Sequence, residues 1–173
     1  CIRDRPEIDY VLEDTGAATV VTDAAGAAFL QPLIETRALR RLDPMPPPGE
    51  EGKLPSVAPH RAAQILYISG TTSRPKGVVT THANIAAQVD TLVKAWGWTA
   101  DDHILHVLPL HHTHGIVNVL LCALWSGASV AFSPPSPREV WARLGRAKSE
   151  GLTLFMAVPT NYALLLREAE REG

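Results

Sequence analysis

Cysteine is scarce in this sequence: Cys1 and Cys122 are the only two among 173 residues. They lie far apart along the chain, so their spacing matches neither a disulfide framework nor a zinc site. So few cysteines suit a reducing compartment. A signal or transit peptide is also lacking at the start, which is cysteine and not methionine. We therefore expect the chain to be a fragment of a longer protein, with any targeting segment outside it.

The chain also lacks a strong excess of positive or of negative charge. The formal net charge is −2 and no long basic run occurs, which disfavours nucleic acid as a partner. A membrane span is not expected, because the most apolar stretch, residues 116–132, is shorter than the roughly 20 residues that a spanning helix needs. Polar and small residues, among them Asn118 and Gly127, interrupt this stretch. It predicts a buried helix, a turn at Gly127 and a buried strand.

What the chain does have is a regular alternation of helical and extended patterns. This alternation favours an α/β fold with a mostly buried sheet and flanking helices. Residues 42–55 are rich in proline and glycine and predict a surface loop. Helices are predicted over residues 5–15, 84–96, 116–125, 136–150 and 159–172. Strands are predicted over residues 17–23, 63–69, 78–81, 103–110, 128–132 and 152–158.

Local signals mark several helix ends. Asn84 is a candidate N-cap for the second predicted helix, and Gly97 is the expected stop. Ser136 and Glu139 are spaced as a capping box. One face of the second helix is expected to be apolar, and it comprises Ile85, Val89, Leu92, Val93 and Trp96.

The segment SGTTSRPKG, residues 69–77, concentrates small, hydroxyl-bearing and cationic residues between two predicted strands. Such residues let a backbone approach a ligand closely and offer donors and positive charge to a phosphate chain. A Walker loop does not fit, because Gly77 follows Lys76 instead of preceding it and a strand comes next. Composition alone leaves two interpretations open, a phosphate-binding loop and a polar hairpin loop without a ligand.

Five histidines cluster between residues 103 and 114. No cysteine lies nearby and no i, i+4 pair on a helix is expected, which disfavours a zinc site. If the segment is extended, His112 and His114 point to one face and His111 to the other. His103 and His106 are interpreted as ordinary strand residues.

Two motifs make the chain recognisable. SGTTSRPKGVV resembles the phosphate-loop signature of the adenylate-forming superfamily, which contains the AMP-forming acyl-CoA synthetases, and PLHHTHG at residues 109–115 matches its P-x-x-H-x-x-G motif. THANI and FMAVPTNYALLL, which is similar to the segment that lines the acyl pocket, follow the family pattern in the same order. The chain is identified as a member of this superfamily and looks most like the malonyl-CoA synthetases. The resemblance implies that residues 1–173 are part of the large N-terminal AMP-binding domain, without the C-terminal domain.

By this resemblance, a carboxylate attacks the α-phosphate of ATP to give an acyl-adenylate and pyrophosphate. Coenzyme A then displaces AMP to give a thioester. The acid would be a short carboxylate or dicarboxylate, with malonate as the best match. ATP, Mg²⁺ and coenzyme A are therefore implied, in an intracellular setting that is mitochondrial or cytoplasmic. Fixed donors around the phosphates would stabilise the charge that develops there.

The resemblance also assigns individual residues. Lys76 and His112 would be catalytic, with His112 near the α-phosphate and the acyl carboxylate and in one cleft with Lys76. His114 would face the second carboxylate of a dicarboxylate, or else make a structural hydrogen bond. Thr72 would lie at the Mg²⁺ that ATP brings. The residues expected to hold the nucleotide are Ser69, Gly70, Thr71, Thr72, Ser73, Lys76 and Gly77.

Three positions depart from the family pattern. Ile68 stands where Ser or Thr is usual, Ser73 where Gly is usual, and Asn161 where the subfamily tends to have a hydrophobic or aromatic residue. The family's downstream Mg²⁺-binding Glu, ribose-binding Asp and C-terminal Lys are not within these residues, so the fragment alone is not expected to be active. A second interpretation is therefore a non-catalytic nucleotide-binding or interaction module descended from such an enzyme.

Overall fold

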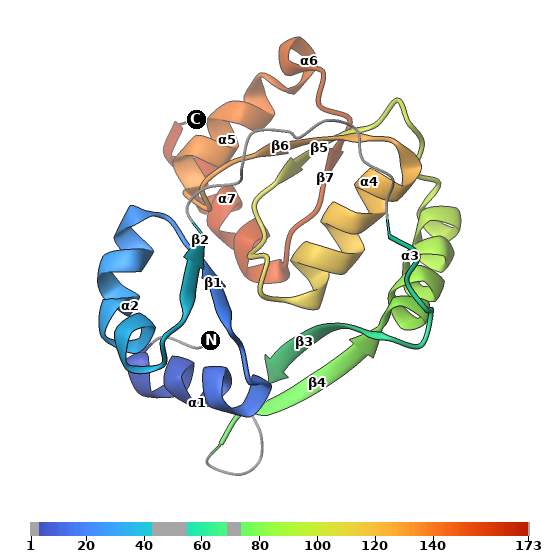
Figure 1. The fold of residues 1–173 in the computed structure, drawn as a ribbon. Coiled ribbons are helices and arrows are strands. Elements are labelled where there is room, and N and C mark those ends of the chain that lie inside the picture. Colours follow the sequence, from blue (N-terminus) through green and yellow to red (C-terminus); the bar gives the residue numbers. More distant parts are fainter. Residues whose placement is uncertain (1–3, 43–54, 69–73, 173) are drawn as a thin grey trace. The chain divides into compact units, whose positions relative to one another are not determined.

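The structure is a computed structural model, and it describes residues 4–42, 55–68 and 74–172. The chain forms two compact units, Cys1–Ser56 and Val57–Gly173. Helices and strands alternate in both units (Figure 1), which confirms the predicted α/β class. None of the helices within the described ranges has the length and apolar character that a bilayer crossing requires.

The first unit is a helix followed by a small βαβ arrangement in which β1 and β2 pair in parallel. The sequence predicts the first helix and the first strand but neither α2 nor β2. Of the predicted loop 42–55, Leu42 is the last residue of β2, and residues 43–54 lie outside the described part of the chain. The elements are α1 (Arg5–Thr15), β1 (Thr19–Val21), α2 (Ala24–Thr36) and β2 (Arg40–Leu42).

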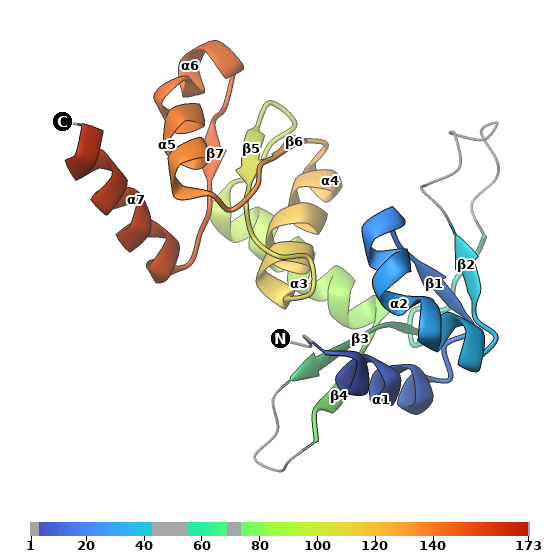
Figure 2. The same ribbon diagram turned by 90° about the vertical axis from the view of Figure 1, so that its left-hand side faces the viewer.

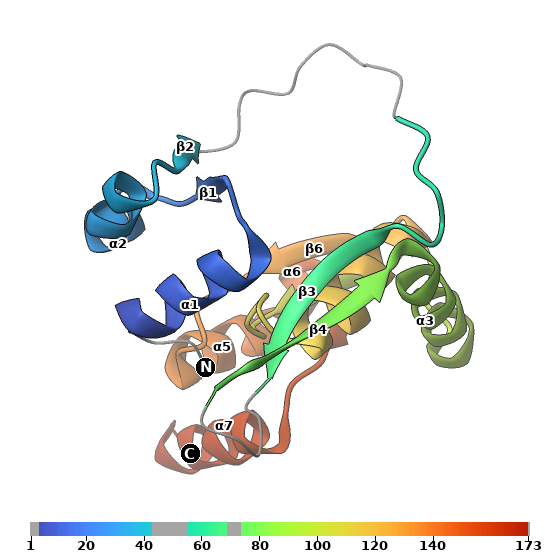
Figure 3. The same ribbon diagram turned by 60° about the horizontal axis from the view of Figure 1, so that its bottom comes forward.

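The second unit begins with an antiparallel hairpin of β3 (Ala62–Ile68) and β4 (Lys76–Thr81), as predicted (Figure 3). The two strands pair from Ile68 opposite Lys76 at the loop end to Ala62 opposite Thr81 at the other. Most side chains of the hairpin are exposed, so this two-stranded sheet does not fit the prediction of a mostly buried sheet.

The helix α3 (His82–Trp96) follows β4 directly. Thr81 is its N-cap, because its hydroxyl accepts from the Asn84 amide at 3.1 Å while the Asn84 side chain accepts from the Thr81 amide at 3.0 Å. The prediction that Asn84 is itself the cap is therefore wrong by three residues. Val89 is buried on the predicted apolar face, but Trp96 is 46% exposed and does not belong to it.

The rest of the second unit is built on a three-stranded parallel sheet in the order β6–β5–β7. The predicted strand 103–110 ends at His106, and the predicted helix 116–125 begins at His114 as a π-helix. The strands are β5 (His103–His106), β6 (Ser129–Phe132) and β7 (Leu154–Phe155). The helices are η1 (His114–Leu121), α4 (Cys122–Ser126), α5 (Pro137–Gly145), α6 (Ala147–Glu150) and α7 (Pro159–Glu172).

Two apolar clusters cover the two faces of β5, because successive residues of a strand point to opposite sides. Ile104 joins the cluster formed with α3, η1 and α4, and Leu105 joins the cluster formed with α5 and α7. Figure 2 shows α3 and α4 on one side of β5 and α5 and α7 on the other. Both side chains are fully buried. This central strand is therefore a firmly packed support for the residues at its carboxyl end.

Candidate functional site

The candidate site lies where β5 ends and the chain turns into η1. Ligands of α/β folds commonly bind outside the carboxyl ends of parallel strands. Here residues 107–113 form a turn between the last residue of β5, His106, and the first residue of η1, His114. The turn carries the P-x-x-H-x-x-G motif, so the sequence motif and the strand edge coincide.

His106 lies beneath this turn and is 2% exposed. Its Nδ1 accepts a hydrogen bond from the Leu108 amide at 3.2 Å, and its Nε2 lies 2.9 Å from the Gly115 carbonyl oxygen. The ring stacks on Phe132 of β6, with centroids 5.1 Å apart. The sequence interpretation of His106 as an ordinary strand residue misses these contacts, because the partners of its two nitrogens lie outside the strand.

The start of η1 packs tightly against the turn. A Cβ atom at Gly115 would lie 2.3 Å from the Pro109 carbonyl oxygen, closer than side-chain carbons come to backbone, so only glycine fits. The His112 amide donates to that same Pro109 oxygen at 3.3 Å, and the Ile116 amide donates to the His112 oxygen at 3.0 Å. The backbone around His112 is therefore closely determined.

The helix that follows is of the π type over eight residues, His114–Leu121. Such helices are rare and occur mostly as single turns, frequently at functional sites. Gly115, Val117 and Val119 are buried in it, whereas His114 is half-buried at its first position. The π-helix thus presents His114 at the edge of the turn while its body enters the core.

A cleft of about 830 Å³ opens beside the turn. Its walls are mostly apolar, and its polar side chains come from the end of β5, the turn, the start of η1, the residue after β6 and the first turn of α7. His112 and His114 both line it, as the sequence predicts, although they lie on a turn and a helix start and not on a strand. The lining residues are His106, Val107, Leu108, Pro109, His112, His114, Gly115, Phe132, Ser133, Pro135, Val158 and Asn161.

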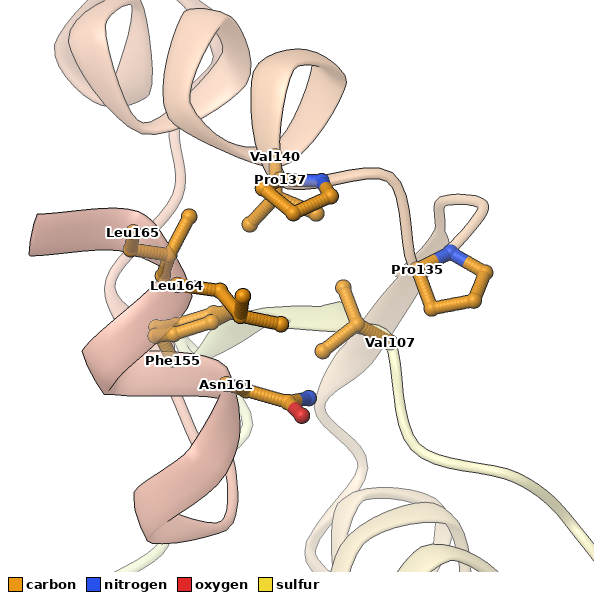
Figure 4. Close-up of a pocket in the computed structure, with 8 residues that line it drawn as sticks. All are labelled: Val107, Pro135, Pro137, Val140, Phe155, Asn161, Leu164 and Leu165. Atoms are coloured by element: carbon orange, nitrogen blue, oxygen red, sulfur yellow. The ribbon is translucent and has the colours of Figure 1, made fainter. Parts of the chain in front are cut away.

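A smaller apolar pocket adjoins this cleft and shares Val107, Pro135 and Asn161 with it. Figure 4 shows that Asn161 extends its carboxamide from α7 toward Val107, among otherwise apolar side chains. The amide therefore places a donor and an acceptor on the cleft wall. The sequence singles out Asn161 as a departure from the family pattern, but it does not predict that this residue and Ser133 line the cleft.

The two neighbouring histidines of the turn differ in their surroundings. The rings of His111 and His112 lie 4.4 Å apart between centroids, and only His112 lines the cleft. Partial burial, followed by the charge of the neighbouring His112, lowers the pKa of His111 below its usual value. The neutral form of His111 is therefore favoured. The segment is not extended, so the strand geometry from which the placement of the three histidines was predicted does not apply.

Lys76, the other predicted catalytic residue, opens β4 and is exposed. Gly77 follows it, and a Cβ there would lie 3.0 Å from Ile65 and 3.2 Å from the Tyr67 ring, so the hairpin packs closely at this point. No described residue of β3 or β4 lines the cleft of His112. The expectation that Lys76 and His112 share one cleft is thus not met by the described residues, because β4 reaches the rest of the unit through α3.

The predicted phosphate-loop residues 69–73 lie outside the described part of the chain. This holds for Ser69, Gly70, Thr71, Thr72 and Ser73, and therefore for the predicted Mg²⁺ contact of Thr72. Within the described ranges, no three His, Cys, Asp or Glu side chains come together as a metal site would require. The zinc interpretation of the histidine cluster thus has no support in the geometry of these residues.

Comparison with known families and curated proteins gives a consistent result. A family model described as "AMP-binding enzyme" matches residues 4–173. The human mitochondrial malonate–CoA ligase ACSF3 is 41% identical over 175 residues, covering 95% of this chain and 30% of that protein. The malonate–CoA ligase of Arabidopsis thaliana is 42% identical over 116 residues, covering 62% of this chain and 19% of that protein.

Comparison with solved structures extends the similarity to the fold. ATP-bound MatB from Rhodopseudomonas palustris superimposes with a TM-score of 0.78 at 29% identity, over 95% of this chain and 34% of that one. A malonyl-CoA ligase in a ternary product complex with methylmalonyl-CoA and AMP gives a TM-score of 0.77 at 30% identity, over 96% of this chain and 35% of that one. The chain therefore spans about a third of the length of most of these relatives and 19% of the Arabidopsis protein.

Proposed function

Because this chain belongs to the AMP-binding enzyme family, we propose that the full-length protein is an ATP-dependent acid–thiol ligase that activates a short carboxylic acid, with malonate as the leading candidate. The observation that carries this proposal is the turn that places His112 and His114 in one cleft at the carboxyl end of β5. The similarity to malonate–CoA ligases over 95% of the chain supports malonate as the acid.

The proposed reaction has two displacements. A carboxylate oxygen of the acid attacks the α-phosphorus of ATP, and the bond to the β-phosphate oxygen breaks, so that pyrophosphate leaves and a mixed anhydride of acid and AMP forms. The sulfur of coenzyme A then attacks the acyl carbon, and AMP leaves with the electron pair of the broken C–O bond. Negative charge grows on phosphate oxygens in the first step, so fixed donors accelerate it.

The chain offers groups of the right chemistry for these charges. His112, exposed on the cleft wall, would donate a hydrogen bond to an α-phosphate or carboxylate oxygen during attack. Lys76, exposed at the end of the hairpin, would pair with the outer phosphates together with the hydroxyls and amides of residues 69–73. Mg²⁺, when bound with ATP, would neutralise phosphate charge, with Thr72 as the nearest predicted hydroxyl. His114 is the candidate partner for a second carboxylate of the acid.

Activity of the full-length protein tests this proposal. We expect malonate to support exchange of pyrophosphate into ATP and then thioester formation with coenzyme A. Acetate and oxalate should support either step less well. If none of the three acids supports exchange, the proposed function is refuted.

Two substitutions test the roles of the predicted residues. His112→Ala should lower kcat by about 10²-fold, because it removes a donor at the reacting centre. Lys76→Ala should raise the KM for ATP, because it removes a charge from the outer phosphates. The matched controls are His111→Ala, next to His112 but outside the cleft, and Lys148→Ala on α6. Equal kinetics for a variant and its control would refute the role assigned to that residue.

A non-catalytic nucleotide-binding module is the second candidate function. It is favoured by Ile68, a 53% exposed apolar residue at the loop end of β3, where the family usually has a hydroxyl. In this case ATP would bind, but no acid would promote pyrophosphate exchange. We further propose a mitochondrial location, because ACSF3 relatives from several vertebrates are named as mitochondrial proteins. Imaging of the full-length protein in cells would test it.

A further inference from the structure

The buried histidine at the end of β5 bonds to backbone groups near both ends of the turn that carries His112. His106 touches the Leu108 amide at 3.2 Å on one side and the Gly115 carbonyl oxygen at 2.9 Å on the other. We propose that His106 is a positioning residue, which sets the turn so that His112 and His114 are correctly placed for the reaction. This inference rests on the proposed ligase function.

The two partners determine where the proton of the ring must lie. The Leu108 amide can only donate, so the Nδ1 atom of His106 must carry a lone pair. The Gly115 carbonyl can only accept, so the Nε2 atom must carry the hydrogen. His106 is therefore held as the neutral Nε2–H form, with both ring nitrogens satisfied and only 2% of the residue exposed.

This arrangement leaves the turn little freedom. The side chain of His106 fixes the turn near its start, at Leu108, and near its end, at Gly115. Between these points the His112 amide bonds to the Pro109 oxygen, and Gly115 lies so close to that oxygen that a Cβ there would be only 2.3 Å away. The ring itself is held by stacking on Phe132 and by the packing of β5. A side chain that supplied only one of the two bonds would release one end of the turn.

The His106 variants can separate the two hydrogen bonds. In His106→Asn the carboxamide oxygen can replace the Nδ1 acceptor, and in His106→Gln the amide nitrogen can replace the Nε2 donor. His106→Leu supplies neither. The matched control is Ile104→Val, which removes one methylene from a fully buried residue on the same face of the same strand, so it loosens the same core cluster without removing either hydrogen bond of His106.

Kinetics of the full-length protein provide the first readout. We expect kcat to fall about five- to tenfold in the Asn and Gln variants and further in the Leu variant, with the KM for ATP unchanged. Ile104→Val should retain the kcat of the wild type when rates are expressed per folded molecule. Equal kcat values for the His106 variants and Ile104→Val would overturn the proposal, because a purely structural role predicts that result.

A second readout does not depend on catalysis. In protein labelled with ¹⁵N at histidine, the ring of His106 should carry its hydrogen on Nε2, and a hydrogen on Nδ1 would overturn the inference. The ring signals of His112 and His114 should shift in His106→Gln but not in Ile104→Val. If the wild type shows no exchange with any acid, the proposed function fails, and these signals alone then decide the positioning role: unchanged signals in His106→Gln refute it.

Discussion

Replacing Gly115 with alanine tests the packing on which the candidate site depends. The added Cβ would lie 2.3 Å from the Pro109 carbonyl oxygen and 3.0 Å from its carbonyl carbon, about 1 Å inside ordinary van der Waals contact. The obstructing atoms are backbone, so no side chain can rotate away. The turn or the start of η1 must shift instead, and the hydrogen bond between His106 and the Gly115 oxygen would weaken with it.

The magnitude follows from opposing contributions. Overpacking of this kind costs about 1–3 kcal/mol, and a weakened hydrogen bond costs about 1 kcal/mol more. Alanine recovers about 1 kcal/mol because it favours helical backbone over glycine. We therefore expect the free energy of opening of the turn to fall by about 1–3 kcal/mol, which corresponds to amide exchange that is faster by roughly five- to 150-fold.

Hydrogen exchange at the amides of His112 and Ile116 measures this opening, since both amides donate backbone hydrogen bonds that close the turn, to the Pro109 and His112 oxygens. Gly145→Ala is the matched control, because Gly145 lies at the end of α5 with no atom within 4 Å of an added Cβ. That variant should leave exchange in the turn unchanged and stabilise the protein slightly. Unaltered exchange at both amides in Gly115→Ala would refute the reasoning.

Three further predictions concern buried and half-buried polar groups. Burial raises the pKa of the Cys122 thiol to about 11, so the thiol should resist alkylation at neutral pH. The free energy of unfolding should fall as the pH rises from about 9 to about 11, because the unfolded chain releases the thiol proton first. Urea unfolding at a series of pH values should show this dependence in the wild type and not in Cys122→Ala. Hydrogen bonds from Thr99, the larger cause, and from Thr153 lower the pKa of Asp102. The stability that the Asp102 carboxylate contributes should therefore be lost as the pH falls below about 4. In Asp102→Asn the free energy of unfolding should depend less on pH in this acid range. Asn161→Phe should shift the ratio of kcat/KM between malonate and butyrate toward butyrate by about tenfold, whereas Ala163→Phe, on the exposed side of α7, should leave the ratio unchanged.

Helices with local end signals were predictable from the sequence, because a cap and its partner lie within a few residues. Gly16 and Gly97 end α1 and α3 in the left-handed conformation that glycine favours, and Ser136 accepts from the Glu139 amide at the start of α5. α2 was not predicted, since Gly26 and Pro32 interrupt its pattern although Asp23 caps it. The helix therefore forms although glycine and proline both lower helix propensity.

In the candidate site, too, some features could be predicted from the sequence and others could not. The motif identified the turn and His112, because its residues are contiguous in sequence. The π-helix could not be predicted, since its hydrogen-bond pattern differs from an α-helix without a separate sequence signal. The roles of His106 and Gly115 were also not predictable, because their partners, Pro109 and Leu108 among them, are fixed only when the turn closes over the strand. The alternation of β5 does show, in retrospect, that His106 shares a buried face with Ile104.

The histidines of this region thus have different roles although they are close in sequence. His106 uses both ring nitrogens to hold backbone groups, so neither nitrogen is available to a ligand, and the surroundings of His111 favour its neutral form. His112 and His114 line the cleft instead, on backbone whose position the buried ring helps to set. Donors that are already in place when charge develops need no reorganisation, and this is the main source of electrostatic stabilisation in enzymes. In the proposed reaction, a firmly packed strand, a neutral buried imidazole and a glycine that admits no side chain would together provide that arrangement for His112.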